Sequence, residues 1–275
     1  PISREEKITS VIHVSEFSED EYLVMLTHNG YIKKTALAAF SRIRANGLIA
    51  ISLEEGDQLR WVRLAREEDS IIIGSRQGMA IHFKADRQQL RPLGRSTRGV
   101  KSMKLRSGDE IISMDVLPSQ VTAEVASAAE EEDEHLEETN EETTVTEPGQ
   151  GPWVLAITRG GYGKRVSVKK FRLQNRAGMG LRGMKFRIDR DELIALHVVN
   201  QDDELMLVTN RGIIIRQAVE SISSQSRMAT GVRVQKLDKD DAIVAVALVP
   251  PSEKEGEEAI EEVQEGEEVK EVEDV

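Results

Sequence analysis

Apolar side chains recur at alternate positions in four stretches of the chain, and each stretch runs into a turn glycine. The four stretches read YLVMLTHNG, SIIIGSRQG, WVLAITRGG and ELMLVTNRG, and they end at Gly30, Gly78, Gly161 and Gly212. A second alternating run follows each glycine. Alternation with a period of two indicates a strand, and a turn glycine between two such runs is typical of a β-hairpin. We therefore predict four β-hairpins.

Two further landmarks follow every hairpin at nearly constant spacing. The first is an R-x-x-x-G element, which occupies 95–99, 176–180 and 227–231 and is replaced by Arg44 and Gly47 in the first unit. The second is an aspartate ten or eleven residues later, which precedes another alternating strand. The hairpin glycines of the first two units lie 48 residues apart, and those of the last two lie 51 apart. Repeats of this length predict four-stranded propeller blades in an all-β fold.

The middle interval differs from the others, because Gly78 and Gly161 lie 83 residues apart. The excess matches a stretch from 118 to 152 that holds eleven Asp and Glu and no Lys or Arg. We expect two blades in 18–117, an acidic disordered insertion in 118–152, two blades in 153–249 and an acidic disordered tail in 250–275. Residues 1–17 resemble the end of a repeat, so we expect them to be the remnant of an upstream blade in a longer polypeptide.

The net charge is unevenly distributed. The whole chain carries −12, but the tail holds twelve acids against two lysines. Without the insertion and the tail, the predicted blades carry +9. The folded part is therefore basic, which suits an anionic partner such as nucleic acid.

No pattern in the sequence supports enzymatic chemistry. There is no cysteine, the five histidines are scattered without metal-ligand spacing, and no phosphate-binding GxxxxGK[ST] loop or G-x-S-x-G turn occurs. We predict no catalytic residue, metal site or cofactor in this chain. The longest apolar stretch, 242–249, is far shorter than the roughly 20 residues that span a bilayer, so we expect a cytoplasmic protein. Phe40, Phe171, Trp61 and Trp153 are predicted to lie in the core.

The repeats resemble the blades of the C-terminal domain of bacterial gyrase A. The resemblance rests on the run from Asn29 to Thr35 (NGYIKKT), on 161–165 (GYGKR) after a TxxG turn, and on the R-x-x-x-G-V elements. It extends from about Glu6 to Val249, without the insertion. The C-terminal domain of the corresponding topoisomerase IV protein is a close relative. The Q-R-R-G-G-x-G loop that gyrases carry in their first blade is absent from this sequence.

The resemblance implies a six-bladed β-pinwheel, in which neighbouring blades exchange strands and duplex DNA wraps around a basic rim. It implies as partners duplex DNA, the catalytic part of gyrase A, and gyrase B, in a holoenzyme of two A and two B subunits near the nucleoid. ATP and magnesium would be used elsewhere in that holoenzyme, which supercoils DNA negatively. None of the three tyrosines lies in the context of a topoisomerase catalytic tyrosine, so this part alone is expected not to catalyse a reaction.

Basic residues recur at equivalent places in the repeats, near the second hairpin strand and in the R-x-x-x-G elements. For any single residue, a solvated surface charge is the alternative interpretation. Because stacked repeats place equivalent residues on one edge, we predict that the set faces DNA. The predicted contacts are Lys33, Lys34, Arg44, Lys84, Arg95, Arg98, Lys101, Lys164, Arg165, Arg176, Arg182, Arg216 and Arg227.

Two other functions stay open at this point. The chain fits topoisomerase IV as well as gyrase, and a propeller can also bind protein partners. Clustering of the repeated cations on one continuous rim would favour DNA, whereas scatter over both faces would favour protein. We also hypothesise that the acidic tail competes with DNA for the basic rim.

Overall fold

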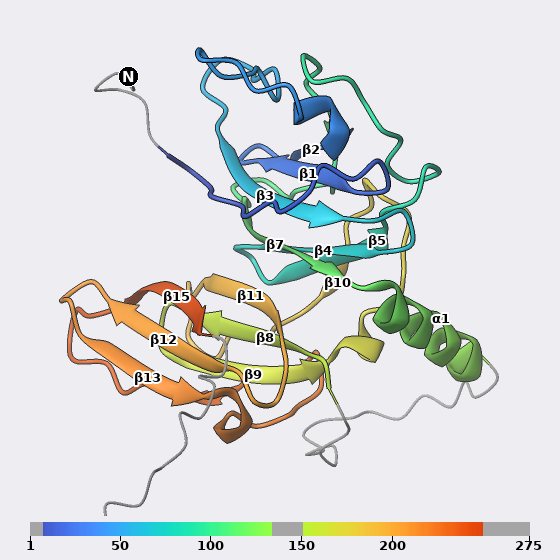
Figure 1. Cartoon of the computed structure of the whole chain (residues 1–275). Coiled ribbons are helices and arrows are strands. Elements are labelled where there is room, and N and C mark those ends of the chain that lie inside the picture. The colour runs from blue at the N-terminus through green and yellow to red at the C-terminus, as the bar shows by residue number, and fades with distance from the viewer. Residues whose placement is uncertain (1–7, 134–150, 250–275) are drawn as a thin grey trace, which may run out of the picture.

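The computed structural model describes residues 8–133 and 151–249, which form four antiparallel sheets stacked one after another (Figure 1). Each sheet is built on one of the predicted hairpins, so the predicted all-β fold of repeated blades is confirmed. The hairpins of blades 1 to 4 are β1 (Tyr22–Thr27) with β2 (Tyr31–Ala36), β4 (Ser70–Ser75) with β5 (Met79–Lys84), β8 (Trp153–Thr158) with β9 (Tyr162–Ser167), and β12 (Glu204–Thr209) with β13 (Ile214–Ala218).

Each hairpin is flanked by an inner strand on its first side and, in blades 1 to 3, by a two-residue outer strand on its second side. Short 3-10 turns follow three of the hairpins. The inner strands are β3 (Leu59–Ala65), β7 (Ile111–Leu117), β11 (Leu193–Val199) and β15 (Ile243–Val249). The outer strands are β6 (Val100–Lys101), β10 (Leu181–Arg182) and β14 (Val232–Arg233), and the 3-10 turns are η1 (Leu37–Phe40), η2 (Val168–Lys170) and η3 (Val219–Ser221).

The outer strands of blades 1 to 3 each come from the next repeat along the chain. β6 follows the R-x-x-x-G element of the second unit, yet it pairs with β2 of the first, with Tyr31 opposite Lys101. β10 pairs in the same way with β5, and β14 with β9. Every R-x-x-x-G element therefore crosses to the preceding blade, and the repeats are interlocked.

The last blade lacks such a strand among the described residues. Ile213 and Ile214, which stand where the exchanged strand would pair, are 45% and 56% exposed, whereas the equivalent Met79 and Ala80 of blade 2 are 6% and 1% exposed. The first unit shows the complementary feature. Its Gly47 has a left-handed φ of +73°, close to those of Gly180 and Gly231, but Ile49 after it is 72% exposed and pairs with no described strand.

The hydrophobic core lies between the blades rather than within them. One cluster joins Val24 of blade 1 to Ile71 of blade 2, and the next joins Ile72 of blade 2 to Val154 of blade 3. A third joins blades 3 and 4 and includes Trp153 and Ile222. Because β4 and β8 are covered on both faces, all their residues are buried, whereas β12 at the end of the stack is buried at alternate positions.

The start of the acidic insertion is ordered, which corrects the prediction of disorder from residue 118. Residues 119–133 form helix α1 (Ser119–Asp133), which lies beside blades 2 and 3 (Figure 1). Thr122 and Val125 are buried, and the Thr122 hydroxyl lies 2.8 Å from that of Ser70 in β4. Glu124 pairs with Lys169 at 3.2 Å. The rest of the insertion, 134–150, and the acidic tail lie outside the described residues.

The segment before the first hairpin forms no strand over 8–17. Ile12, Val14 and Phe17 instead line a pocket of about 350 Å³ with Phe40 and Leu23 of blade 1. Residues 1–7 lie outside the described part of the chain. The assignment of 1–17 to an upstream blade therefore stays a prediction.

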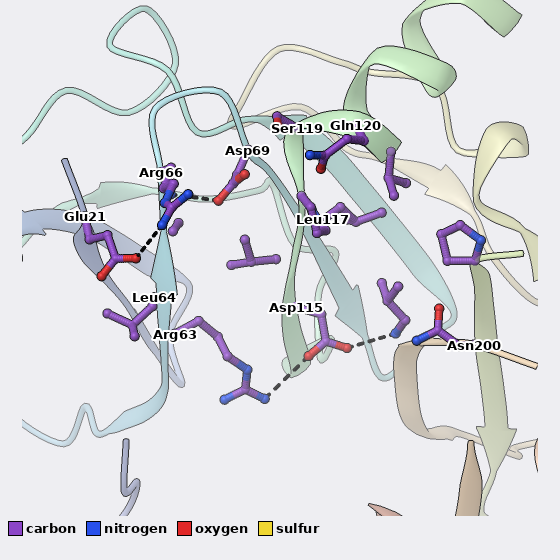
Figure 2. Close-up of a pocket in the computed structure, with 16 residues that line it drawn as sticks. Glu21, Arg63, Leu64, Arg66, Asp69, Asp115, Leu117, Ser119, Gln120 and Asn200 are labelled. Atoms are coloured by element: carbon purple, nitrogen blue, oxygen red, sulfur yellow. Dashed lines mark hydrogen bonds and ion pairs between the residues drawn. The ribbon is translucent and has the colours of Figure 1, made fainter. Parts of the chain in front are cut away.

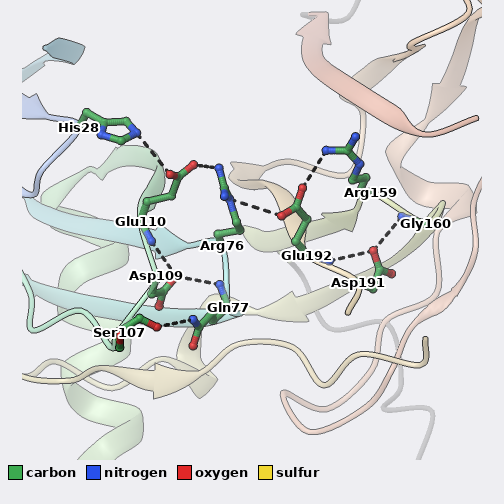
Figure 3. A network of polar contacts seen from close by, with 10 residues as sticks. All are labelled: His28, Arg76, Gln77, Ser107, Asp109, Glu110, Arg159, Gly160, Asp191 and Glu192. Atoms are coloured by element: carbon green, nitrogen blue, oxygen red, sulfur yellow. Dashed lines mark hydrogen bonds and ion pairs between the residues drawn. The ribbon is translucent and has the colours of Figure 1, made fainter. Parts of the chain in front are cut away.

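A ladder of charges connects the first three blades along their hairpin turns (Figure 3). Arg76 pairs with Glu110 of its own blade and lies 3.5 Å from Glu192 of blade 3, which also pairs with Arg159 at 2.9 Å. His28 of blade 1 reaches Glu110 at 3.4 Å. Blade 4 carries Ala242 where Glu110 and Glu192 stand, so this ladder ends at blade 3. The ladder adds polar contacts between neighbouring blades that are already joined by the hydrophobic core.

Replacing Glu192 by glutamine is expected to lower the free energy of unfolding by about 0.5–1 kcal/mol, because the residue serves two arginines but is partly exposed to solvent. Chemical denaturation at 0.05 M and 1 M NaCl measures the effect, which should shrink at high salt. Glu54→Gln is the matched control, because within the described part of the chain Glu54 forms an ion pair with the exposed Arg98 alone. Equal losses for the two variants would contradict a special contribution of the ladder.

Candidate nucleic-acid interface

Four of the cations predicted to contact DNA are buried, and for these the prediction is wrong. Lys33, Lys34 and Lys164 are 0% exposed, and Arg165 is 7% exposed. They lie in β2 and β9, whose outward side is covered by the R-x-x-x-G element of the next unit. A buried cation is stable only when it is paired or hydrogen-bonded. Their partners therefore explain what these residues do.

The Lys33 ammonium lies in a cage of main-chain carbonyls. It donates hydrogen bonds to the carbonyl oxygens of Ala50 at 2.6 Å, of Thr97 at 3.1 Å and of Arg95. Two of these carbonyls belong to the element 95–99 of the next unit. Burial lowers the pKa of Lys33 to about 8. The lysine holds the exchanged loop against blade 1.

Lys164 forms the same cage two blades later. Its ammonium donates to the carbonyl oxygens of Ser226 at 2.7 Å, of Arg227 at 2.6 Å and of Ala229 at 2.9 Å. Burial, together with the nearby charge of Arg227, lowers the pKa of Lys164 to about 7. Because Arg95 and Arg227 occupy equivalent positions in their elements, the two cages are the same structural feature, present in blades 1 and 3.

In blades 1 to 3, the next position in the second hairpin strand carries another buried anchor. Lys34 donates to Glu67 at 2.8 Å, and Arg165 donates to the Ile222 carbonyl at 2.6 Å. His82 donates from Nδ1 to the Phe171 carbonyl at 2.7 Å and faces the Ser70 hydroxyl with Nε2. Burial lowers the pKa of His82 to about 4, so the ring is neutral near pH 7. This buried Ser–His pair has no access to a substrate and serves packing.

The arginines that open or follow the R-x-x-x-G elements, namely Arg95, Arg176, Arg182 and Arg227, are half-buried. Arg176 donates from Nε to the Gln89 carbonyl at 2.5 Å, and burial lowers its pKa. Arg227 donates to the Arg182 carbonyl at 3.3 Å. These two side chains tie one element to the preceding one, and this leaves them fewer donors for an external anion.

The remaining predicted contacts are exposed: Arg44, Lys84, Arg98, Lys101 and Arg216. Arg98 pairs with Glu54 and lies over the Tyr31 ring at 4.6 Å. Arg216 pairs with Glu204 inside blade 4. Arg44, Lys84 and Lys101 form no ion pair within the described residues. These three are the predicted residues best placed to contact an anion.

The structure brings out a second series of cations that the sequence analysis missed. Lys104, Lys185 and Lys236 each lie five residues after an element glycine, and all three are exposed. Each follows an outer strand, so the three repeat along the outer edge of blades 1 to 3. Lys101, Arg182 and Arg233 precede them by three residues and complete what we call the outer rim. Their constant distance from the glycine of the R-x-x-x-G element could have identified these lysines from the sequence.

The pocket near the inner strands is lined by side chains of both charges (Figure 2). Its volume is about 680 Å³, and it is lined by Arg63 and Arg66 but also by Glu21, Asp69 and Asp115. Burial alone would raise the pKa of Asp115, but hydrogen bonds from His197 and a backbone amide hold it below its usual range. These groups neutralise one another between neighbouring blades.

Other kinds of site find little support in the described residues. No group of three or more His, Asp or Glu side chains there is placed to hold a metal ion. No helix in the same residues is long and apolar enough to cross a membrane. Tyr22, Tyr31 and Tyr162 each lie beneath a cationic side chain, at 4.5 to 5.7 Å from the ring centre.

A family model described as "DNA gyrase C-terminal domain, beta-propeller" matches this chain four times, over 21–66, 69–118, 152–200 and 203–250. The four matches coincide with the four hairpin units and leave out the insertion and most of the tail. They cover well over half of the chain.

Among curated proteins, the DNA gyrase A protein of Synechocystis sp. (strain ATCC 27184 / PCC 6803 / Kazusa) is 65% identical over 264 residues, which are 96% of this chain and 30% of that protein. The chloroplastic/mitochondrial DNA gyrase A protein of Arabidopsis thaliana is 38% identical over 262 residues, which are 92% of this chain and 26% of that protein. The chain thus spans less than a third of the length of these relatives.

Two solved structures share the fold. The C-terminal domain of DNA topoisomerase IV matches with a TM-score of 0.73 and 22% identity, over 91% of this chain and 68% of that one. A DNA gyrase A C-terminal domain matches with a TM-score of 0.68 and 24% identity, over 90% of this chain and 72% of that one.

Proposed function

The chain belongs to the DNA gyrase C-terminal domain family, and from that premise we propose that it binds and wraps duplex DNA as part of a gyrase A protein. The single observation that carries the proposal is the outer rim. Cations recur there at the same two offsets in three consecutive repeats, on the edge formed by the exchanged strands. Repetition on one edge offers a continuous track for a polyanion.

The chemistry of the outer rim suits phosphate rather than bases. Lysine and arginine side chains neutralise phosphates and release counterions, and this term depends on salt but carries no sequence information. Among the described residues, no helix lies on the rim to enter a groove and read base edges. Binding should therefore tolerate any sequence and should favour DNA that bends easily.

Gyrase is preferred over topoisomerase IV as the source of the domain. The topoisomerase IV structure matches slightly better in shape, but an identity of 22% supports the fold alone. A gyrase A protein is 65% identical over nearly the whole chain. A protein-binding propeller is the weaker alternative, because the three lysines recur at the same position after the outer strands of three consecutive blades.

In this proposal the chain acts with parts that lie outside it. The remainder of gyrase A, together with gyrase B, would supply strand cleavage, ATP hydrolysis and magnesium, and the wrapped DNA would set the sign of supercoiling. The protein would work in the cytoplasm, at the nucleoid. The blades themselves would contribute binding and geometry, without catalysis.

Affinity for a linear duplex of about 150 base pairs, measured across a salt series, tests the proposal together with relaxation of a DNA circle in the presence of the chain. We expect tight, sequence-tolerant binding that weakens steeply with salt, and captured writhe of constant sign. Absence of binding at low salt would refute DNA binding by this chain. Binding without captured writhe would refute wrapping but leave DNA binding intact.

A further inference from the structure

The carbonyls that bind Lys33 and Lys164 also determine the direction in which the N–H groups of the same two loops point. In a trans peptide the C=O and the following N–H point in opposite directions. Because the carbonyls of Arg95 and Thr97 point inward to the Lys33 ammonium, the N–H groups of Ser96 and Arg98 point away from it. By the same geometry, the carbonyls of Arg227 and Ala229 turn the N–H groups of Met228 and Thr230 away from Lys164.

These four N–H groups have no hydrogen-bond acceptor among the described residues. Ser96, Arg98 and Met228 are exposed, and Thr230 is half-buried. Pairs of main-chain N–H groups that converge outward from one loop form an anion-binding concavity. The exposed Arg98 guanidinium and the Thr230 hydroxyl belong to the same two loops, where they add donors.

We propose that the N–H pairs Ser96/Arg98 and Met228/Thr230 are phosphate-binding sites in the loops that lead into the outer strands, and that the buried lysines Lys33 and Lys164 are the positioning residues that build them. This inference rests on the proposed DNA binding, because the ligand is a phosphodiester of the duplex backbone. The shared chemistry is that of a tetrahedral oxyanion, so a free anion is the other source that the test must separate. Lysines with no exposed surface thus act on DNA through the backbone of the next repeat.

The loop between these two provides an internal contrast. Blade 2 carries Ile81 where Lys33 and Lys164 stand, so no ammonium gathers the carbonyls of the element 176–180. The N–H of Ala177, which corresponds to that of Ser96, donates to the Ser102 carbonyl at 2.8 Å. That of Arg176 donates to the Gln89 side chain at 2.8 Å. The N–H of Ala177 is therefore not free for an anion, and we expect this loop to lack the paired site.

The proposal predicts that anion binding and the stability contributed by Lys164 change with pH in opposite directions. A neutral amine donates at most two hydrogen bonds, so a cage of three carbonyls loosens when Lys164, whose pKa is about 7, loses its proton. Anion binding at Met228 and Thr230 should therefore fall between about pH 6.5 and 8.5. Among the described residues, the charged group that influences the pKa of this ammonium is the Arg227 guanidinium.

The free energy of unfolding should change with the opposite sign. The pKa of Lys164 is lowered from its ordinary 10.5, so the unfolded chain holds more protons between about pH 7 and 10.5. Stability contributed by this residue therefore rises with pH over that window. A loss of anion binding at the same pH cannot then be attributed to unfolding.

The test compares the unaltered chain with Lys164→Met and Lys33→Met, which keep a side chain of similar length without the ammonium. Backbone amide shifts of Ser96, Arg98, Met228 and Thr230 are followed by NMR during titration with a 20-base-pair duplex and, separately, with sodium sulfate, which does not change charge in this pH range. We expect Lys164→Met to abolish the shifts at Met228 and Thr230 only. Lys33→Met should abolish those at Ser96 and Arg98 only. Each variant is the control for the other, and duplex affinity should fall about threefold to tenfold in each.

The outcomes separate the two proposals. Shifts with both probes support a general oxyanion site, and shifts with the duplex alone support a site that needs the DNA backbone. Shifts with sulfate in a chain that binds no duplex would leave the anion sites standing and refute the proposed function. Duplex binding without movement of these amides, or with equal movement in both variants, would overturn the inference. If a variant does not fold, the pH titration of the unaltered chain decides, because constant shifts from pH 6.5 to 8.5 would contradict a role for the Lys164 ammonium.

Discussion

Simultaneous replacement of Lys104, Lys185 and Lys236 by alanine is expected to lower the affinity for a 150-base-pair duplex by about 100-fold at 0.1 M salt. Each lysine is exposed at the same repeat position next to an exchanged outer strand. If each neutralises one phosphate, the slope of log affinity against log salt should become shallower by about 0.9 per residue removed. Fluorescence anisotropy across a salt series measures both quantities.

A matched control removes the same charge from elsewhere. Arg60→Ala, Arg66→Ala and Lys239→Ala together delete three exposed cations from β3, from the turn after it and from the turn before β15. Affinity should then fall only slightly and the salt slope should stay within error of the unaltered chain. Equal losses for the two triple variants would show that net charge, rather than the outer rim, governs binding.

Replacement of Gly180 by alanine is expected to lower the free energy of unfolding by about 3 kcal/mol, or the melting temperature by roughly 6–12 °C for a chain of this size. Gly180 has φ +76°, where a side chain is strained, and a Cβ would lie 2.5 Å from the carbonyl oxygen of Ala80 in the preceding blade. That contact is with backbone and cannot relax cheaply. The exchanged strand β10 and Arg182 within it should be displaced as a result.

Gly47→Ala isolates the clash from the backbone strain. Gly47 is the equivalent glycine of the first unit and has nearly the same φ, +73°, but nothing lies within 4 Å of a Cβ there. We expect a loss of about 1 kcal/mol, which is the conformational cost alone. Thermal unfolding followed by circular dichroism compares the two. Similar losses would mean that the close approach between blades contributes little.

The blades could be predicted because the signals for each repeat lie close together in the sequence. Hairpin glycines with positive φ and alternating strands recur with a fixed period, and the left-handed conformation is present at Gly30, Gly78, Gly161 and Gly212. The predicted core positions Phe171 and Trp153 are buried as well. Exchange of the outer strands followed from the family resemblance, because nothing in two residues such as Val100 and Lys101 marks a strand.

The candidate site was predicted less well, and the reason is the distance along the chain between partners. Lys33 finds two of its carbonyls more than sixty residues away, and a lysine in an alternating strand is indistinguishable in sequence from one that faces solvent. Lys104 and its equivalents were visible in the repeat, but they lie beyond the R-x-x-x-G element, outside the pattern that carried the prediction. The helix α1 was not predicted, because the many acidic residues of 118–152 indicated disorder, although the alanines of the helix favour helix formation.

Strand exchange also fixes an order of events during protein synthesis. The hairpin of blade 1 ends at Ala36, but the strand that completes its sheet begins at Val100, 64 residues later. On a ribosome, the edge of the first blade would stay unpaired, and one of its faces uncovered, until the second repeat had emerged. The same would hold for each later blade and the repeat after it. The nascent chain would therefore always carry one incomplete blade in its most recently synthesised part. The unpaired backbone of that blade would be accessible to chaperones until the next repeat had emerged.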